Sequence, residues 1–220
     1  NITGAFSNNN AWGYSHFPNP SDPGRGDIYF NLNALKYFPS YAPGSEAYAV
    51  AIHEIGHALG LKHPHDDGGT GRPTFSSVGI FNTDYMTVMS YNDSYPLNMF
   101  SWSPATPMAL DVIALQYLYG KNNNTNTGDS IYTLTRSNLY LTIWDASGND
   151  TIDQSSSNEG WFINLPNTQV SNLVDTKVGF GIPLSDWNNQ YQSAPTSLAW
   201  LTGDIENVKG SNFTDTIYGS

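Results

Sequence analysis

The chain has 220 residues and a formal net charge of −11, because 19 acidic residues outnumber 8 basic ones, and it contains no cysteine. This composition excludes disulfide bonds and thiolate catalysis, and it argues against a nucleic-acid partner, which needs clustered lysine and arginine. No run approaches the roughly 20 uncharged apolar residues that a transmembrane helix requires, so we expect no membrane span.

The first 45 residues are rich in Asn, Gly, Pro and Ser, and one short strand is predicted within them. It runs from Asp27 to Asn31, where an apolar centre is bounded by Gly24 and Gly26. The composition of the residues before this strand is typical of a loop.

The clearest helix is predicted between Ser45 and Gly60. Ser45 is a typical N-cap residue, Glu46 places a negative charge in the first turn, and Gly60 can end the helix. A stretch rich in Gly, Pro, Asp and Thr follows at 64–85 and predicts a long loop. A loop of that length in a compact domain is more often functional than idle.

A second helix is predicted up to Gly120, with Thr106 as its cap and Pro107 at its first position. Its apolar residues recur at roughly helical spacing, and they are Ala109, Val112, Ile113, Leu115 and Leu118.

The composition changes at Lys121, where a polar run interrupts the helical pattern. We place a domain boundary there, which divides the chain into residues 1–120 and 121–220. The second part predicts an all-β region of short strands separated by turns, at 131–135, 139–144, 160–165 and 198–201. Two of its segments, 147–152 and 213–217, resemble each other.

A metal-binding pattern lies in the first predicted helix, because the chain from His53 to His63 reads H-E-x-x-H-x-x-G-x-x-H. On a helix, His53 and His57 share one face and can hold a single metal ion. Gly60 can take a positive φ and turn the chain, so that His63 becomes the third ligand. Three neutral imidazoles leave a fourth position on zinc for water, which is typical of a catalytic site. Glu54 can lie beside that water without binding the metal.

These residues resemble the motif of the metzincin metallopeptidases. Met89 is similar to the methionine of their Met-turn, which forms an apolar floor under the metal. Pro64 directly after the third histidine, and Tyr91 two residues after Met89, resemble the serralysin branch. The resemblance covers most of the chain from about Asp27 onward, and it includes the segments 110–111 and 118–120.

The resemblance implies an α+β fold: a metzincin-like catalytic domain with a β-sheet, the zinc helix and a C-terminal helix, followed by an all-β calcium-binding region that starts a degenerate β-roll. It implies that Glu54 is the general base and that Tyr91 is a further zinc ligand, which moves away to stabilise the oxyanion. The strand at 28–30 is implied to be a sheet edge that lines the cleft, where a peptide could pair with it, although an ordinary strand fits the same residues equally well. Metzincins usually carry a long helix and further strands before that edge, so we expect a processed or incomplete form of a longer protein.

The resemblance also implies calcium in the second part of the chain. Calcium prefers hard oxygen ligands from carboxylates and from carbonyls in turns. The residues at the matching positions are Asn126, Gly128, Ser130, Asp145, Ser147, Gly148, Asp150, Asp204 and Glu206. Turns rich in Asn and Asp that bind no metal explain the same pattern, so this alternative stays open.

Three functions fit the sequence. The favoured one is a secreted, extracellular, monomeric zinc endopeptidase that hydrolyses protein or peptide substrates, with Zn²⁺ and Ca²⁺ as cofactors. The second is a catalytically weak, zinc-containing binding or adhesion module of a larger surface protein. The third is a zinc hydrolase that acts on another class of substrate. The presence of Glu54 favours an enzyme, because a binding module has no use for a general base.

Overall fold

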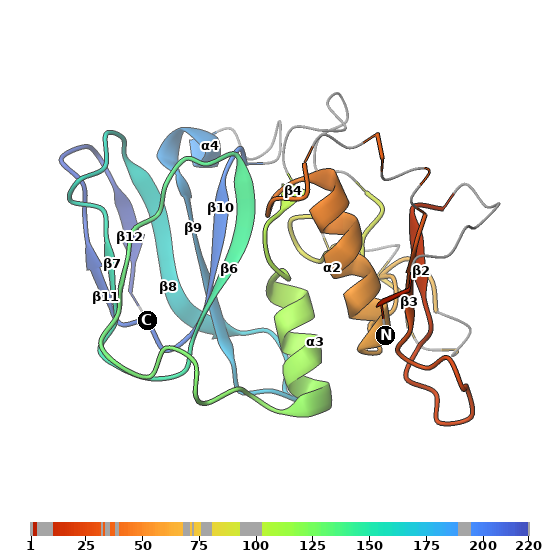
Figure 1. Ribbon diagram of the computed structural model, residues 1–220. Coiled ribbons are helices and arrows are strands. Elements are labelled where there is room, and N and C mark those ends of the chain that lie inside the picture. The colour runs from red at the N-terminus through yellow and green to blue at the C-terminus, as the bar shows by residue number, and fades with distance from the viewer. Residues whose placement is uncertain are drawn as a thin grey trace.

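A computed structural model of the chain describes residues 2–3, 11–31, 33, 36–37, 40–67, 71, 73–75, 81–92, 103–188 and 195–219. The architecture is mixed α+β, as predicted, with two long helices between a small N-terminal sheet and a larger C-terminal sheet (Figure 1). Within the described residues, no helix has the length and apolar character needed to cross a bilayer.

The N-terminal sheet has three short strands, β1 (Ile2–Thr3), β2 (Gly13–Ser15) and β3 (Ile28–Phe30), in the order β1-β3-β2. The predicted strand is confirmed as β3, but the prediction that it forms the sheet edge is wrong. It pairs in parallel with β1 and antiparallel with β2, so both of its sides are occupied. The edge strand next to the helix that carries His53 and His57 is instead β2, which has only three residues in a stretch of loop-like composition.

The zinc helix, α2 (Glu46–Ala58), begins and ends as its sequence predicts. The Ser45 hydroxyl accepts a hydrogen bond from the Tyr48 N–H at 3.3 Å, which satisfies one free donor of the first turn. Gly60 follows the last turn with φ of +95°, a conformation that costs other residues steric strain. The helix therefore stops where the third histidine must turn back.

The second helix, α3 (Ala109–Tyr119), starts two residues later than the capping pattern predicts. Its N-cap is Met108, whose N–H donates to the Asp111 carboxylate at 2.8 Å. The predicted cap, Thr106, instead accepts a hydrogen bond from the Thr142 N–H at 2.7 Å. The prediction of the helix end is confirmed, because Gly120 follows with φ of +83°.

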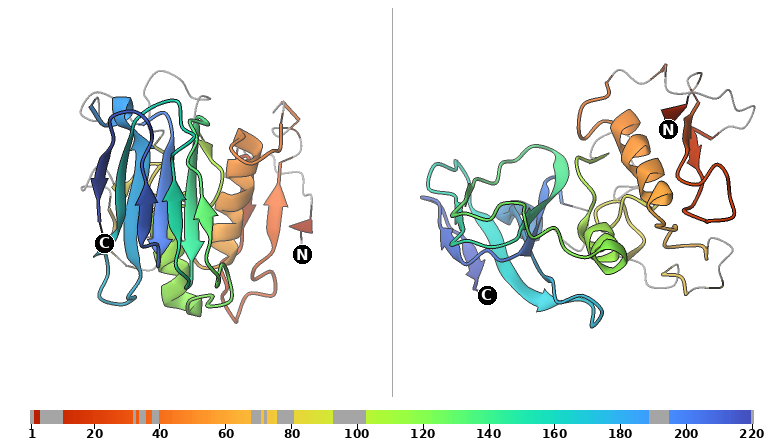
Figure 2. Two further views of the ribbon diagram at one scale, coloured as in Figure 1. Left: turned by 90° about the vertical axis from the view of Figure 1, so that its left-hand side faces the viewer. Right: turned by 60° about the horizontal axis from the view of Figure 1, so that its bottom comes forward.

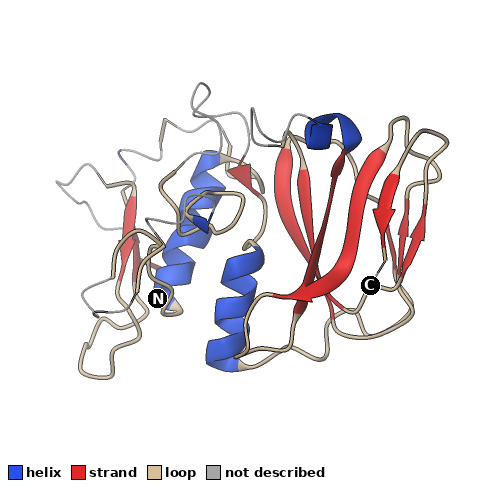
Figure 3. Ribbon diagram, turned by 180° about the vertical axis from the view of Figure 1, so that it is seen from behind, coloured by secondary structure: helices blue, strands red, loops and turns tan. Residues whose placement is uncertain are grey.

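The C-terminal part contains a six-stranded sheet in the order β12-β8-β9-β10-β6-β4, with a smaller sheet β11-β7-β5 beside it (Figures 2 and 3). The large sheet consists of β4 (Ser103–Pro104), β6 (Leu139–Asp145), β8 (Trp161–Gln169), β9 (Lys177–Pro183), β10 (Leu198–Gly203) and β12 (Thr216–Tyr218). The smaller one consists of β5 (Ile131–Tyr132), β7 (Thr151–Asp153) and β11 (Asn207–Lys209). The four predicted β-runs are confirmed as β5, β6, β8 and β10, although a short helix, α4 (Leu184–Asn188), interrupts the all-β pattern.

The sequence does not predict strand β9, because it contains glycines, which are untypical of strands. A side chain at Gly179 would collide with the backbone of β8 at Asn164, and one at Gly181 would collide with Leu134. Glycine weakens a strand in general but permits close approach of neighbouring chains. The strand therefore lies in the middle of the sheet in spite of its sequence.

The two parts of the chain share a sheet and a core. Strand β4 precedes α3 in the chain yet pairs with β6, with Ser103 opposite Leu139. One buried cluster likewise combines residues from both sides of position 120, and it consists of Leu61, Val88, Met89, Met108, Tyr140, Phe162, Ile182 and Leu198. The boundary between residues 120 and 121 stays a prediction.

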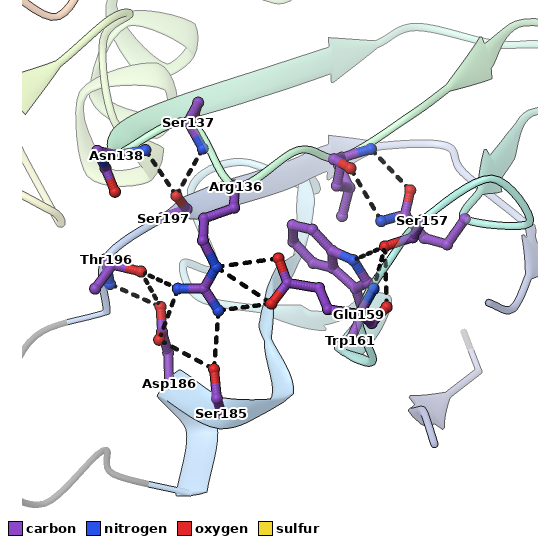
Figure 4. Close-up of polar contacts among 12 residues, drawn as sticks. Arg136, Ser137, Asn138, Ser157, Glu159, Trp161, Ser185, Asp186, Thr196 and Ser197 are labelled. Carbon is purple, nitrogen blue, oxygen red and sulfur yellow. Dashed lines mark hydrogen bonds and ion pairs between the residues drawn. The ribbon is translucent and has the colours of Figure 1, made fainter. Parts of the chain in front are cut away.

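A polar network around Arg136 joins four segments at one end of the large sheet (Figure 4). The guanidinium donates to Glu159 at 2.7 and 3.0 Å and to the Ser185 hydroxyl at 2.8 Å. It also donates to Asp186 at 3.2 Å and to the Thr196 hydroxyl at 2.6 Å. Such a fork of charge-assisted bonds fixes the geometry of the segments it joins.

Candidate zinc centre

Three histidine side chains converge as the motif predicts. His53 and His57 project from successive turns of α2, and His63 returns to them after the bend at Gly60. The Nε2 atom of His63 lies 3.2 Å from Nε2 of His53 and 2.9 Å from Nε2 of His57. Ligand nitrogens around a tetrahedral zinc are about 3.3 Å apart, as follows from a Zn–N distance of about 2.0 Å.

The other ring nitrogen of each histidine has its own hydrogen-bond partner. Nδ1 of His53 lies 2.8 Å from the Val88 carbonyl, and Nδ1 of His57 lies 2.8 Å from the Leu61 carbonyl. Carbonyl oxygens only accept, so both Nδ1 atoms carry the proton and both Nε2 atoms present a lone pair. Nδ1 of His63 has a carboxylate partner, Asp66, at 2.6 Å.

Burial keeps these imidazoles neutral. It lowers the pKa of His53 to about 4, and it also lowers the pKa values of His57 and His63 from their ordinary range. Metal ions bind the neutral imidazole, so near neutral pH these rings are ready to bind without first losing protons. The donor set and its spacing therefore fit a zinc ion.

Glu54 lies next in the chain to His53, and only 6% of its surface is exposed. Burial raises the pKa of its carboxyl group to about 7, while a hydrogen bond from Ser15 opposes this rise. A carboxylate with a pKa near the working pH can both accept and release a proton.

Met89 lies beneath the zinc helix with 1% of its surface exposed. It packs against Gly56, between two of the histidines, where an added Cβ would stand 2.5 Å from the methionine sulfur. The neighbouring Val88 carbonyl accepts the hydrogen bond from His53, so this turn also orients a metal ligand. The prediction of an apolar floor below the histidines is consistent with this packing.

Asp111 connects that turn to α3, a role that the sequence did not predict. Its buried carboxylate accepts hydrogen bonds from the Thr87 hydroxyl at 2.5 Å and from the Val88 N–H at 2.8 Å, besides the bond from Met108. Burial raises its pKa to about 6, and these three donors limit the rise. The signal in the sequence is an acidic residue in the first turn of a helix.

Tyr91 and His65 complete the surroundings of the histidines. Tyr91 is 65% exposed, and its ring centroid lies 4.4 Å from that of His63 and 5.5 Å from that of His53. His65 stacks on His63 at 5.0 Å rather than standing free in solvent. Pro64 between these histidines is buried. Zinc coordination by Tyr91 stays a prediction.

The predicted calcium residues meet most closely at Asp150, whose side chain is fully buried. One carboxylate oxygen accepts from the Ser130 N–H at 2.7 Å, whereas Oδ2 has no hydrogen-bond partner among the described residues. A Cβ on Gly148 would stand 2.7 Å from the Gly128 carbonyl oxygen and 2.9 Å from both Asp150 oxygens. This gathering of oxygens around a partnerless carboxylate oxygen fits a hard cation.

Asp145 and Glu206 lie against the same turn. Asp145 is fully buried, and burial together with the nearby charge of Asp150 raises its pKa. The Ser147 N–H donates to Asp145 at 3.1 Å, and Glu206 accepts from the Asp150 N–H at 2.8 Å. Asp145 and Asp150 are thus two buried acids side by side, a costly arrangement that a bound cation would relieve.

Two other predicted residues have contacts at the ends of strands instead. The Asn126 amide donates to the Trp144 carbonyl at 2.8 Å, and the Asp204 N–H donates to the Asp145 carbonyl at 3.1 Å. These contacts neither require nor exclude a metal ion, so their role as calcium ligands stays a prediction.

The second of the two similar segments has a different environment. Both oxygens of its aspartate, Asp215, accept hydrogen bonds, from the Trp161 N–H at 2.8 Å and from the Ser211 N–H at 2.7 Å. The Ser211 hydroxyl also contacts both oxygens. Both oxygens of Asp215 thus accept hydrogen bonds from protein donors, whereas Oδ2 of Asp150 has no such partner among the described residues. The calcium prediction therefore rests on the turn at Asp150.

Comparisons with known proteins match both parts of the chain. The family model described as Matrixin matches residues 6–89, and the one described as Peptidase M10 serralysin C terminal matches residues 110–182. Serralysin C of Dickeya chrysanthemi is 35% identical over 183 residues, which are 74% of this chain and 37% of that protein. Serralysin of Proteus mirabilis is 39% identical over 144 residues, 56% of this chain and 28% of that protein.

A third relative, Metalloprotease AprA of Pseudomonas entomophila (strain L48), is 33% identical over 196 residues, which are 77% of this chain and 40% of that protein. The chain thus spans about two fifths or less of the length of these curated relatives. Since both family models match and the histidine motif assembles in three dimensions, the chain belongs to the serralysin-like metzincins.

Proposed function

We propose that the chain is the catalytic part of a zinc-dependent endopeptidase, with Glu54 as its general base. The observation that carries this proposal is that the Nε2 atoms of three histidines converge beside a buried glutamate. The Nδ1 atom of each ring has a hydrogen-bond partner of its own. The same glutamate favours an enzyme over a zinc-containing binding module, because a metal site that only binds gains nothing from a neighbouring base.

The residues of the chain would divide the chemistry between them. Zinc, when bound to His53, His57 and His63, supplies Lewis acidity that polarises the scissile carbonyl and acidifies water. Glu54 would take the proton from the attacking water and deliver it to the leaving nitrogen. Tyr91 would donate a hydrogen bond to the developing oxyanion, a contact worth on the order of 3 kcal/mol in other enzymes.

The position of β2 supports a peptide substrate. This strand is the edge of the N-terminal sheet, and its Ser15 hydroxyl lies 2.8 Å from the Glu54 carbonyl oxygen, so the edge borders the zinc centre. An extended peptide can pair with such an edge through backbone hydrogen bonds. The sheet would then present the peptide bond to the histidines.

We also propose a structural calcium ion at Asp150. Its oxygens and the Gly128 carbonyl oxygen would be ligands, and the buried Asp145 would supply further negative charge. The ion would hold β7 and the turn before it against the loop at 128–130. Secretion and a monomeric state stay predictions from the family resemblance.

Removal and return of zinc test the proposed function. With calcium held constant, we expect the zinc-loaded chain to digest casein, a zinc chelator to abolish digestion, and one equivalent of zinc to restore it. Digestion by protein shown to be zinc-free would contradict the proposal. A zinc-loaded chain that digests neither casein nor short peptides would favour the binding module.

A further inference from the structure

We infer that Ser15, on the edge strand β2, is a positioning residue that holds the Glu54 carboxylate in its working orientation. The inference rests on the proposed function, in which Glu54 is the general base. Ser15 lies outside the histidine motif, 39 positions before Glu54 in the chain.

The Ser15 hydroxyl contacts Glu54 at two points. Its Oγ atom lies 2.8 Å from the Glu54 carbonyl oxygen and 3.2 Å from the carboxylate oxygen Oε2. In the part of the chain that the structure describes, no other group donates a hydrogen bond to this carboxylate. Among the described residues this hydroxyl is therefore the one donor to the carboxylate, and it shares its single proton between Oε2 and the carbonyl oxygen of the helix backbone.

Gly13 supports the same interpretation from the same strand. Residues 13 and 15 of a strand face the same side, and a Cβ on Gly13 would stand 2.9 Å from Glu54 Cγ and 3.0 Å from Oε1. The strand thus leaves room for the glutamate at one position and supplies a donor at the next on that face. Together the two residues confine the side chain.

The pairing of β2 with β3 sets which residues face Glu54. Gly13 is opposite Phe30 and Ser15 is opposite Ile28, while the Tyr14 ring between them stacks on Tyr29 at 4.6 Å. A shift by one residue would turn the tyrosine to the side of the glutamate. The strand that borders the cleft therefore also positions the base.

The test compares Ser15→Ala with the unaltered chain, both zinc-loaded, in the hydrolysis of a fluorogenic peptide. We expect kcat to fall about tenfold, as for a lost hydrogen bond to a charged group, with KM and zinc content unchanged. The melting temperature should fall by only about 2–4 °C, because the hydrogen bond to the Glu54 carbonyl is lost as well. Ser15→Thr, which keeps the hydroxyl, should retain most of the activity. In a Glu54→Gln background, Ser15→Ala should cause no further loss, because the effect acts through the carboxylate.

Each other outcome decides against the inference. An unchanged kcat for Ser15→Ala, a loss that persists in the Glu54→Gln background, or a loss explained by missing zinc would overturn it while the proposed function stands. Absence of hydrolysis by the unaltered zinc-loaded chain would instead overturn the proposed function, and this inference with it.

Discussion

Glu54→Gln is expected to lower kcat for peptide hydrolysis by about 10²- to 10⁴-fold, the range that general acid–base catalysis contributes in other enzymes. The physical reason is that an amide cannot take a proton from water, although it keeps the volume of the carboxyl group. Zinc binding should persist, because the Nδ1 atoms of the three histidines donate to the Val88 and Leu61 carbonyls and to the Asp66 carboxylate, and none of these bonds involves Glu54.

The matched control is Glu46→Gln, which removes the same charge from the first turn of the same helix. We expect the control to keep its activity, and we expect both variants to bind one zinc ion per chain. Casein digestion and zinc content measured on the same samples provide the comparison. Equal digestion by Glu54→Gln and the unaltered chain would rule out Glu54 as the base.

Removal of calcium is expected to have the largest effect on stability. A ligand present at 100 to 1,000 times its dissociation constant stabilises the folded state by about 3–4 kcal/mol. For a chain of this size, that corresponds to a melting temperature on the order of ten degrees higher with calcium than without it. The cause is that Asp145 and Asp150 are both fully buried and that Oδ2 of Asp150 has no hydrogen-bond partner among the described residues.

Asp150→Asn should abolish most of this calcium-dependent shift, since it removes a charged ligand. The control is Asp153→Asn, three residues later, where the carboxylate already pairs with Lys209 at 3.3 Å. Thermal unfolding is measured with and without calcium, with a chelator too weak to remove zinc. A melting temperature that does not respond to calcium in the unaltered chain would eliminate this site.

The zinc helix and its histidines could be predicted because every determinant is local. Ser45 and Gly60 mark the ends of the helix, and the spacing of His53 and His57 places both on one face. The start of α3 was predicted two residues early, because Thr106 has a cap-like sequence but accepts a hydrogen bond from Thr142, 36 positions away. A prediction from neighbouring residues alone cannot take into account a hydrogen-bond partner that is so distant in the chain.

The N-terminal sheet was predicted only in part for a related reason. Strand β2 has three residues, and its place at the edge depends on pairing with β3 rather than on its own apolar pattern. The contact between Ser15 and Glu54 follows from that pairing, so the sequence alone offers no sign of it. Strand β9 is not predicted because it contains Gly179 and Gly181, and glycine has a low propensity for strands. In the structure these glycines allow neighbouring segments to pack closely, which the sequence of one strand does not reveal.

The proposed zinc site has three imidazole ligands and a position left open to solvent. X-ray absorption at the zinc edge, on the chain loaded with one equivalent of zinc, tests this arrangement most directly. We predict three imidazole nitrogens at about 2.0–2.1 Å, with the remaining ligands being oxygen from water or from the Tyr91 phenol. A fourth imidazole, or fewer than three, would contradict this zinc site.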